Sequence, residues 1–164
     1  DLGWTIRNQT EVLLRHIDEY QYDLVIGSSM GGLAAANASS LREKSDFKLL
    51  LIAPAFGLSD SWENLRDEEL DSWERMGVRR YRGFDLEIDL GWDFMEDARE
   101  MSWPTIRHQT TIIHGSKDDI VPLEVSQTVS EDSELVDLIV IDDGHRMKRS
   151  LSYLSDVASS LVSS

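Results

Sequence analysis

Residues 22–33 decide the fold, and they read Tyr-Asp-Leu-Val-Ile-Gly-Ser-Ser-Met-Gly-Gly-Leu. The first five are a short, apolar, β-rich run of the kind that is buried in a parallel sheet. Residues 32–38 are mostly small and apolar and predict a closely packed helix. Between the two lies a G-x-S-x-G pentapeptide at 27–31. The sequence therefore predicts a strand, a sharp turn with Ser29 at its apex, and a helix.

The predicted turn has the features that a nucleophile elbow requires. We expect Ser29 to have a strained backbone and to point its hydroxyl out at the carboxyl end of the sheet, beside the positive end of the helix dipole. Side chains at 27 and 31 would collide with the neighbouring backbone, which explains the two glycines. An ordinary Gly/Ser turn is the alternative for this pentapeptide taken alone.

A carboxylate and a histidine follow two later predicted strands. Residues 110–115 are an apolar run followed by Asp118, and residues 138–141 are another, followed by His145. Open α/β sheets bind ligands at the carboxyl ends of their strands, so Ser29, Asp118 and His145 are expected at one edge. Their order along the chain, Ser, Asp, His, is the order that α/β-hydrolases use.

These segments together resemble the α/β-hydrolase superfamily of serine esterases. Residues 27–32 resemble its nucleophile elbow, residues 114–122 (His-Gly-Ser-Lys-Asp-Asp-Ile-Val-Pro) its acid loop, and Gly144-His145 its histidine loop. Shorter strings at 5–9 and 53–56 resemble a group of small bacterial esterases with a short lid. The resemblance implies an α/β-hydrolase fold, with a mostly parallel sheet flanked by helices.

We expect one α/β-hydrolase domain over residues 1–164, with a core at 1–56 and 106–164 and a lid-like insertion at about 57–105. The insertion interrupts the alternation of strands and helices. It predicts a helix around 59–76, a strand or hairpin arm over 84–90 and a helix over 92–101. Its Trp62 and Trp73 are candidate substrate-binding residues of an apolar acyl pocket; the alternative is that they only pack the insertion onto the domain.

The superfamily places a strand with a His-Gly motif before the elbow strand, and its loop supplies one oxyanion-hole donor. In this sequence a single predicted helix, about 6–20, precedes the elbow strand. We therefore expect a strand-helix-strand portion of roughly 30 residues to precede Asp1 in the full protein, or a second chain to supply it. Without it, the elbow strand would leave an apolar edge.

The resemblance implies a catalytic triad. Ser29 would attack a carbonyl, His145 would act as the base, and Asp118, rather than the neighbouring Asp119, would hold the imidazole. The backbone N–H of Met30 is the expected oxyanion donor. The expected reaction is hydrolysis of carboxylic esters with short to medium acyl groups through an acyl-enzyme. Thioesterase, amidase or acyltransferase activity, and a non-catalytic binding protein of the same fold, remain the alternatives.

Composition narrows the partners. The chain has no cysteine, which excludes disulfides, thiol nucleophiles and thiolate metal sites. Its formal charge of −15 disfavours binding to nucleic acid and to anionic membranes. No histidine pair has metal-ligand spacing, so we expect no metal and no cofactor. We find no signal-peptide pattern and no apolar run near ~18 residues, so we expect cytoplasmic localisation. The expected partner is a small ester substrate, with a possible homo-oligomer or a second chain that supplies the missing strands.

Overall fold

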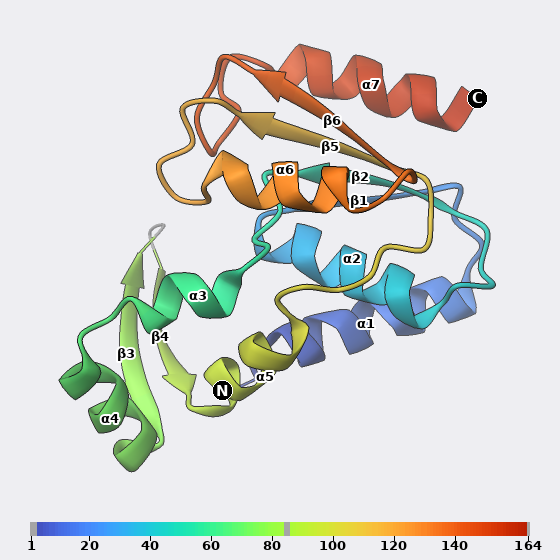
Figure 1. Ribbon diagram of the computed structural model, residues 1–164. Helices are drawn as coiled ribbons and strands as arrows, with labels where there is room; N and C mark the ends of the chain where they lie inside the picture. Colours follow the sequence, from blue (N-terminus) through green and yellow to red (C-terminus); the bar gives the residue numbers. More distant parts are fainter. Residues whose placement is uncertain (1–2, 84–85, 164) are drawn as a thin grey trace.

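The computed structural model describes residues 3–83 and 86–163. Within these ranges the main sheet has four parallel strands in the order β1-β2-β5-β6 (Figure 1). The prediction of a parallel sheet flanked by helices is confirmed, and each predicted core strand lies within two residues of the observed one. The strands are β1 (Leu24–Ser28), β2 (Lys48–Ile52), β5 (Thr110–Gly115) and β6 (Val136–Ile141).

Helices cover both faces of this sheet. Helices α1 (Ile6–Glu19) and α2 (Met30–Leu41) pack against each other on one face, and α7 (Leu151–Ser163) lies on the opposite face (Figure 1). Helix α6 (Leu123–Glu131) packs on β5 and β6 and was not predicted. Its apolar residues are only half-buried, so their periodicity is weak in the sequence.

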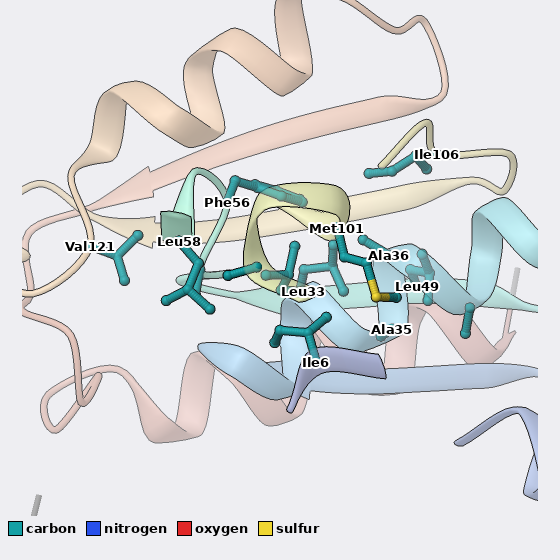
Figure 2. Close-up of a cluster of buried hydrophobic side chains, with 14 of the residues drawn as sticks. Ile6, Leu33, Ala35, Ala36, Leu49, Phe56, Leu58, Met101, Ile106 and Val121 are labelled. Carbon is teal, nitrogen blue, oxygen red and sulfur yellow. The ribbon is translucent and has the colours of Figure 1, made fainter. Parts of the chain in front are cut away.

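Local sequence explains the two helices that flank the elbow. The Thr5 hydroxyl caps α1 by accepting the N–H of Asn8, and the buried residues of α1 recur at helical spacing. Helix α2 consists mostly of small residues and is buried from Gly32 to Ser39. Small side chains let the α2 backbone approach β1 and β2 closely. The apolar side chains of these elements form a continuous core (Figure 2).

Strand β1 lies at the edge of the described sheet, with β2 as its neighbour. One of its side chains, Val25, is buried, whereas Ile26 is 53 % exposed. The apolar edge expected for the elbow strand is thus present in the described part of the chain. Within the same ranges, none of the helices combines the length and the apolarity needed to cross a bilayer.

The insertion differs from its predicted outline. The helix predicted around 59–76 is wrong as a single element, because Asn64 ends the first helix and Arg66 adopts extended backbone before the second. The strand predicted over 84–90 begins at Leu86; its first two residues, Phe84 and Asp85, lie outside the described residues. The elements are α3 (Leu58–Glu63), α4 (Asp67–Met76), β3 (Val78–Gly83), β4 (Leu86–Gly91) and α5 (Asp93–Met101).

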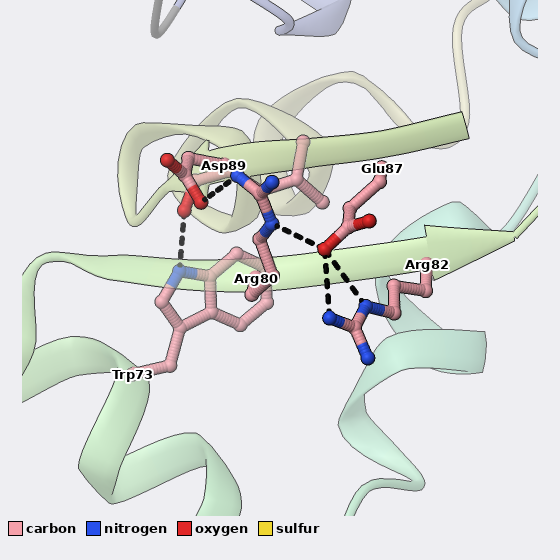
Figure 3. A network of polar contacts seen from close by, with 6 residues as sticks. Trp73, Arg80, Arg82, Glu87 and Asp89 are labelled. Carbon is pink, nitrogen blue, oxygen red and sulfur yellow. Dashed lines mark hydrogen bonds and ion pairs between the residues drawn. The ribbon is translucent and has the colours of Figure 1, made fainter.

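Strands β3 and β4 form an antiparallel hairpin. Figure 3 shows cross-strand ion pairs on its exposed face, where Arg80 contacts Glu87 and Asp89, and Arg82 contacts Glu87. Exposed pairs of this kind contribute little to stability. Trp73 contributes more, because its ring is only 2 % exposed and its indole N–H donates to the backbone carbonyl of Leu90 at 3.1 Å.

One buried polar side chain joins the insertion to the rest of the molecule, and another joins two helices within the insertion. The Asn37 amide on α2 donates to the carbonyl of Met101 at 2.9 Å. The Ser102 hydroxyl donates to the carbonyl of Ala98 and accepts the N–H of Ser59 at 2.9 Å, which links α5 to α3. Ser102 is 1 % exposed, so these bonds have no competition from water.

We expect Ser102→Ala to lower the free energy of unfolding by about 1–3 kcal/mol, because it leaves the buried N–H of Ser59 without its acceptor. Urea denaturation measures this change. Ser159→Ala removes a serine hydroxyl from an exposed position on α7 and is expected to change stability by less than about 0.5 kcal/mol. Equal effects of the two substitutions would contradict the assigned role of Ser102.

Candidate active site

Ser29 lies between the end of β1 and the start of α2, at φ 53° and ψ −121°. A non-glycine residue with positive φ costs on the order of 1–3 kcal/mol and persists only where its surroundings fix it. Here the Ser29 N–H donates to the carbonyl of Ile52 at 2.9 Å, and the Ser29 carbonyl accepts the N–H of Ala55 at 3.0 Å. These bonds to the end of β2 hold the strained turn.

The steric explanation for the glycines holds at one of the two predicted positions. A Cβ at Gly27 would lie 2.4 Å from the carbonyl oxygen of Gly31, so no side chain fits there. The prediction for Gly31 itself is wrong, because a Cβ at Gly31 would meet nothing within 4 Å. The second tight position is Gly32, where a Cβ would lie 3.0 Å from the Pro54 side chain.

Asp118 and His145 come together from two different loops. The Nδ1 atom of His145 lies 2.8 Å from Oδ2 of Asp118. A carboxylate only accepts hydrogen bonds, so Nδ1 carries the proton and the lone pair of the neutral ring is on Nε2. The other carboxylate oxygen accepts the N–H groups of Ile120 and Val121, each at 2.9 Å. The Asp118 side chain is fully buried, whereas Asp119 is exposed.

His114 is part of the same network. Its Nε2 lies 3.0 Å from the carbonyl of Val121 and 3.3 Å from Oδ2 of Asp118, and its Nδ1 lies 2.7 Å from the Ser126 hydroxyl. Because a carbonyl only accepts, Nε2 carries the proton and Nδ1 accepts from Ser126. The contact of His114 with Asp118 was not foreseen, because the sequence does not reveal where the acid loop folds back.

The loop that carries His145 is held by Asp143. One carboxylate oxygen of Asp143 accepts the N–H of Gly144, and the other accepts the N–H of Arg149 and the hydroxyl of Ser150. Burial raises the pKa of the Asp143 carboxyl, but the hydrogen bonds outweigh burial and hold this pKa below its ordinary value.

The acid loop and the histidine loop are in direct backbone contact. A Cβ at Gly115 would lie 2.2 Å from the carbonyl oxygen of Asp143. The Ser116 N–H, next in the chain, donates to the carbonyl of Ile141 at 2.8 Å, and the Lys117 N–H donates to that of Asp143 at 3.0 Å. The spacing between the two loops is therefore set by main-chain atoms and not by long side chains.

Ser29 and His145 line the same cavity of about 500 Å³. The residues that complete this cavity are mostly apolar and come largely from the segment after β2 and from the insertion. They include Met30, Phe56, Leu58, Trp62, Tyr81, Leu90, Phe94 and Val121. A pocket of this kind accepts an apolar group beside a few polar atoms.

The two tryptophans singled out in the sequence have different positions. Trp62 lines the cavity, with its ring 5.1 Å from that of Phe94 between centroids. Trp73 does not line it; its ring packs behind Trp62 at 5.5 Å, which corrects the expectation of direct substrate contact at this residue. Hydrophobicity alone could not distinguish the two, because both are aromatic residues of the same insertion.

Two other polar residues, His108 and Asp142, have structural partners. His108, for which the sequence indicates no partner, is bonded at Nδ1 to the Ser39 hydroxyl and at Nε2 to the carbonyl of Ser45, each at 2.7 Å. Asp142 pairs with Lys117. In the ranges that the structure describes, no three His, Asp or Glu side chains gather in a group able to hold a metal ion.

Asp143→Asn is expected to lower the melting temperature at neutral pH, because an amide cannot accept all three of these hydrogen bonds. The folded-state pKa of Asp143 is depressed, so its contribution is present above the unfolded value near ~4 and is lost as pH falls through the folded value. Melting curves from pH 7 to pH 3 should show the difference between wild type and variant narrowing below about pH 4. A difference that does not change with pH would refute this assignment.

Comparison with solved structures identifies the fold. The chain matches α/β hydrolase domain-containing protein 10 from mouse with a TM-score of 0.80 and 24% identity, covering 97% of this chain and 70% of that one. It matches Est1E from Butyrivibrio proteoclasticus with a TM-score of 0.72 and 18% identity, over 98% and 69% of the two chains. An esterase from Exiguobacterium antarcticum gives a TM-score of 0.66 and 18% identity, over 99% and 75%.

At these identities the likeness establishes the fold, and the α/β-hydrolase fold predicted from the sequence is confirmed. No curated protein matches the chain. A sequence model of the uncharacterised protein family UPF0227 matches residues 2–161. The chain belongs to this family.

Proposed function

We propose that this protein is a serine hydrolase that cleaves carboxylic esters through an acyl-enzyme intermediate. One observation carries the proposal: the strained Ser29 lines the same cavity as His145, whose imidazole is bonded to the buried Asp118 carboxylate. A serine at a positive-φ turn, a histidine and a buried acid are the three parts that nucleophilic acyl transfer needs.

Each residue has a defined task in this reaction. The Ser29 hydroxyl attacks the ester carbonyl while Nε2 of His145 takes its proton, and the same proton then goes to the departing alcohol. Asp118 keeps the proton on Nδ1 and stabilises the imidazolium as charge develops. A water molecule, activated by the same imidazole, hydrolyses the acyl-enzyme and releases the acid.

We assign the backbone N–H of Met30 as one oxyanion donor. Met30 is the first residue of α2, and an N–H in the first turn of a helix has no acceptor within that helix. It also lies at the positive end of the helix dipole, which favours a negative oxygen. A donor of this kind contributes roughly 3 kcal/mol of transition-state stabilisation.

The lining of the cavity supports an apolar acyl group. Trp62, Phe94 and Leu58 contribute to its wall, and each methylene that leaves water for such a wall contributes ~0.8 kcal/mol. The volume of about 500 Å³ fits short to medium acyl chains. One structural relative is named as an esterase, and another, Est1E, was solved with ferulic acid bound. These names support an ester substrate over a thioester or an amide.

The first test is covalent labelling. A fluorophosphonate probe should label the wild-type protein, and Ser29→Ala should abolish the labelling, because the probe reacts with an activated serine. Ser28→Ala removes the adjacent serine and should leave the labelling in place. A wild-type protein that is not labelled would favour the alternative of a binding protein with the same fold.

The second test concerns Asp118. Asp118→Asn should lower kcat for a p-nitrophenyl butyrate substrate by about 10²–10⁴-fold, because an amide no longer fixes the proton on Nδ1 of His145. Asp119→Asn makes the same chemical change at the exposed neighbour and should alter kcat less than about threefold. Equal losses in both variants would contradict the assignment of the acid.

A further inference from the structure

A second cavity, of about 720 Å³, adjoins the apolar cavity at His145. Three segments form it: the acid loop, the loop that carries His145, and strand β3 of the insertion. His145 and Arg146 line both cavities, whereas Ser29 lines only the apolar one. The second cavity therefore adjoins the apolar one at His145 and does not include the serine.

The walls of this second cavity are cationic in a chain whose formal charge is −15. The sequence has five Lys and Arg residues after residue 106, and four of them line this one cavity. They are Lys117, Arg146, Lys148 and Arg149.

Two carboxylates, from Asp119 and Asp143, also belong to the lining. Asp143 directs its oxygens to the backbone and hydroxyl groups of its own loop and also interacts with the charge of Arg149, which helps to lower the pKa of the Asp143 carboxyl. Lys117 is paired with Asp142 at 2.5 Å. Lys148 and Arg149 are exposed side chains on the same loop as His145. The three cations of this loop, Arg146, Lys148 and Arg149, therefore outnumber the two carboxylates of the lining, which favours an anion in the cavity.

The chemistry of the proposed reaction determines which part of a substrate reaches this cavity. The imidazole gives its proton to the leaving oxygen, so the alcohol portion of an ester must lie on the imidazole side of the serine. The acyl portion lies in the apolar cavity that Ser29 lines. The rest of the alcohol then extends into the cavity that starts at His145 and does not include Ser29.

We propose, resting on the serine-hydrolase function above, that this cavity binds a carboxylate, sulfate or phosphate on the alcohol portion of the ester. Lys148 and Arg149 are the specificity-determining residues. An arginine fork and a lysine ammonium both pair with such oxyanions, and the pairing is stronger than a neutral hydrogen bond. Since both side chains are exposed, the preference weakens as salt screens it.

The test compares two esters that differ in the charge of the alcohol portion. The butyrate ester of 4-hydroxybenzoate is anionic, and that of 4-hydroxybenzamide is its neutral counterpart. We expect the wild-type kcat/KM to favour the anionic ester by about five- to tenfold at low salt, mainly through KM. Raising the NaCl concentration from about 0.05 to 0.5 M should reduce this ratio toward one.

Substitutions then assign the preference to the cavity. The double variant Lys148→Gln and Arg149→Gln should reduce the anionic-to-neutral ratio to about one. The control variant Arg15→Gln and Lys44→Gln makes the same change in net charge on α1 and on the loop before β2, and it should keep the wild-type ratio. A ratio that falls equally in both variants would overturn the proposal, since it would reflect net charge alone.

Two further outcomes separate this inference from the proposed function. If Ser29-dependent hydrolysis of the neutral ester is measured but the wild-type ratio is one, the anion site is wrong and the serine hydrolase stands. If neither ester is hydrolysed and the fluorophosphonate probe does not react, the hydrolase itself is wrong. A phenyl monoester of succinate carries its anion on the acyl side; a preference for it that depends on Lys148 and Arg149 would overturn the assignment to the alcohol side.

Discussion

The buried carboxylate of Asp118 is the interaction on which the site depends. A charge removed from water is tolerated only when hydrogen bonds replace its hydration. Here the backbone at 120–121 binds one oxygen, and the rings of His145 and His114 contact the other. His114 is bonded in turn to Ser126 on α6, so this one group joins β5, the acid loop, α6 and the histidine loop.

The insertion gives this polar centre its apolar surroundings. Its aromatic rings pack against one another around Trp73, whose indole is tied to the backbone of β4. This rigid support holds Trp62 in the wall of the apolar cavity. Tyr81 on β3 lines both cavities, so the hairpin bounds the proposed acyl and alcohol sites together. A change in the position of the hairpin would alter both sites at once.

The core was predictable because its signals are local. Apolar runs gave the strands near 24–28, 110–115 and 136–141, and the residues after them gave Ser29, Asp118 and His145 as candidates. The insertion was less predictable, since its helix break at Asn64 and the position of Trp73 depend on packing between segments distant in sequence. The cationic cavity could not be predicted from the sequence, because Lys117 is almost thirty residues from Arg146, Lys148 and Arg149, and the two loops meet only in the folded chain.

The backbone contact at Gly115 has a consequence for how this family can vary. No side chain fits between Gly115 and the carbonyl of Asp143. The backbone of the two loops therefore sets their separation, which does not depend on the side chains that contact a substrate. Surface positions such as Lys148 and Arg149 can then diversify during evolution while the imidazole and carboxylate keep their alignment. In the proposed hydrolase, selectivity and catalysis would thereby reside on separate parts of the same loop, and a new substrate range could be acquired without a change in the reactive centre.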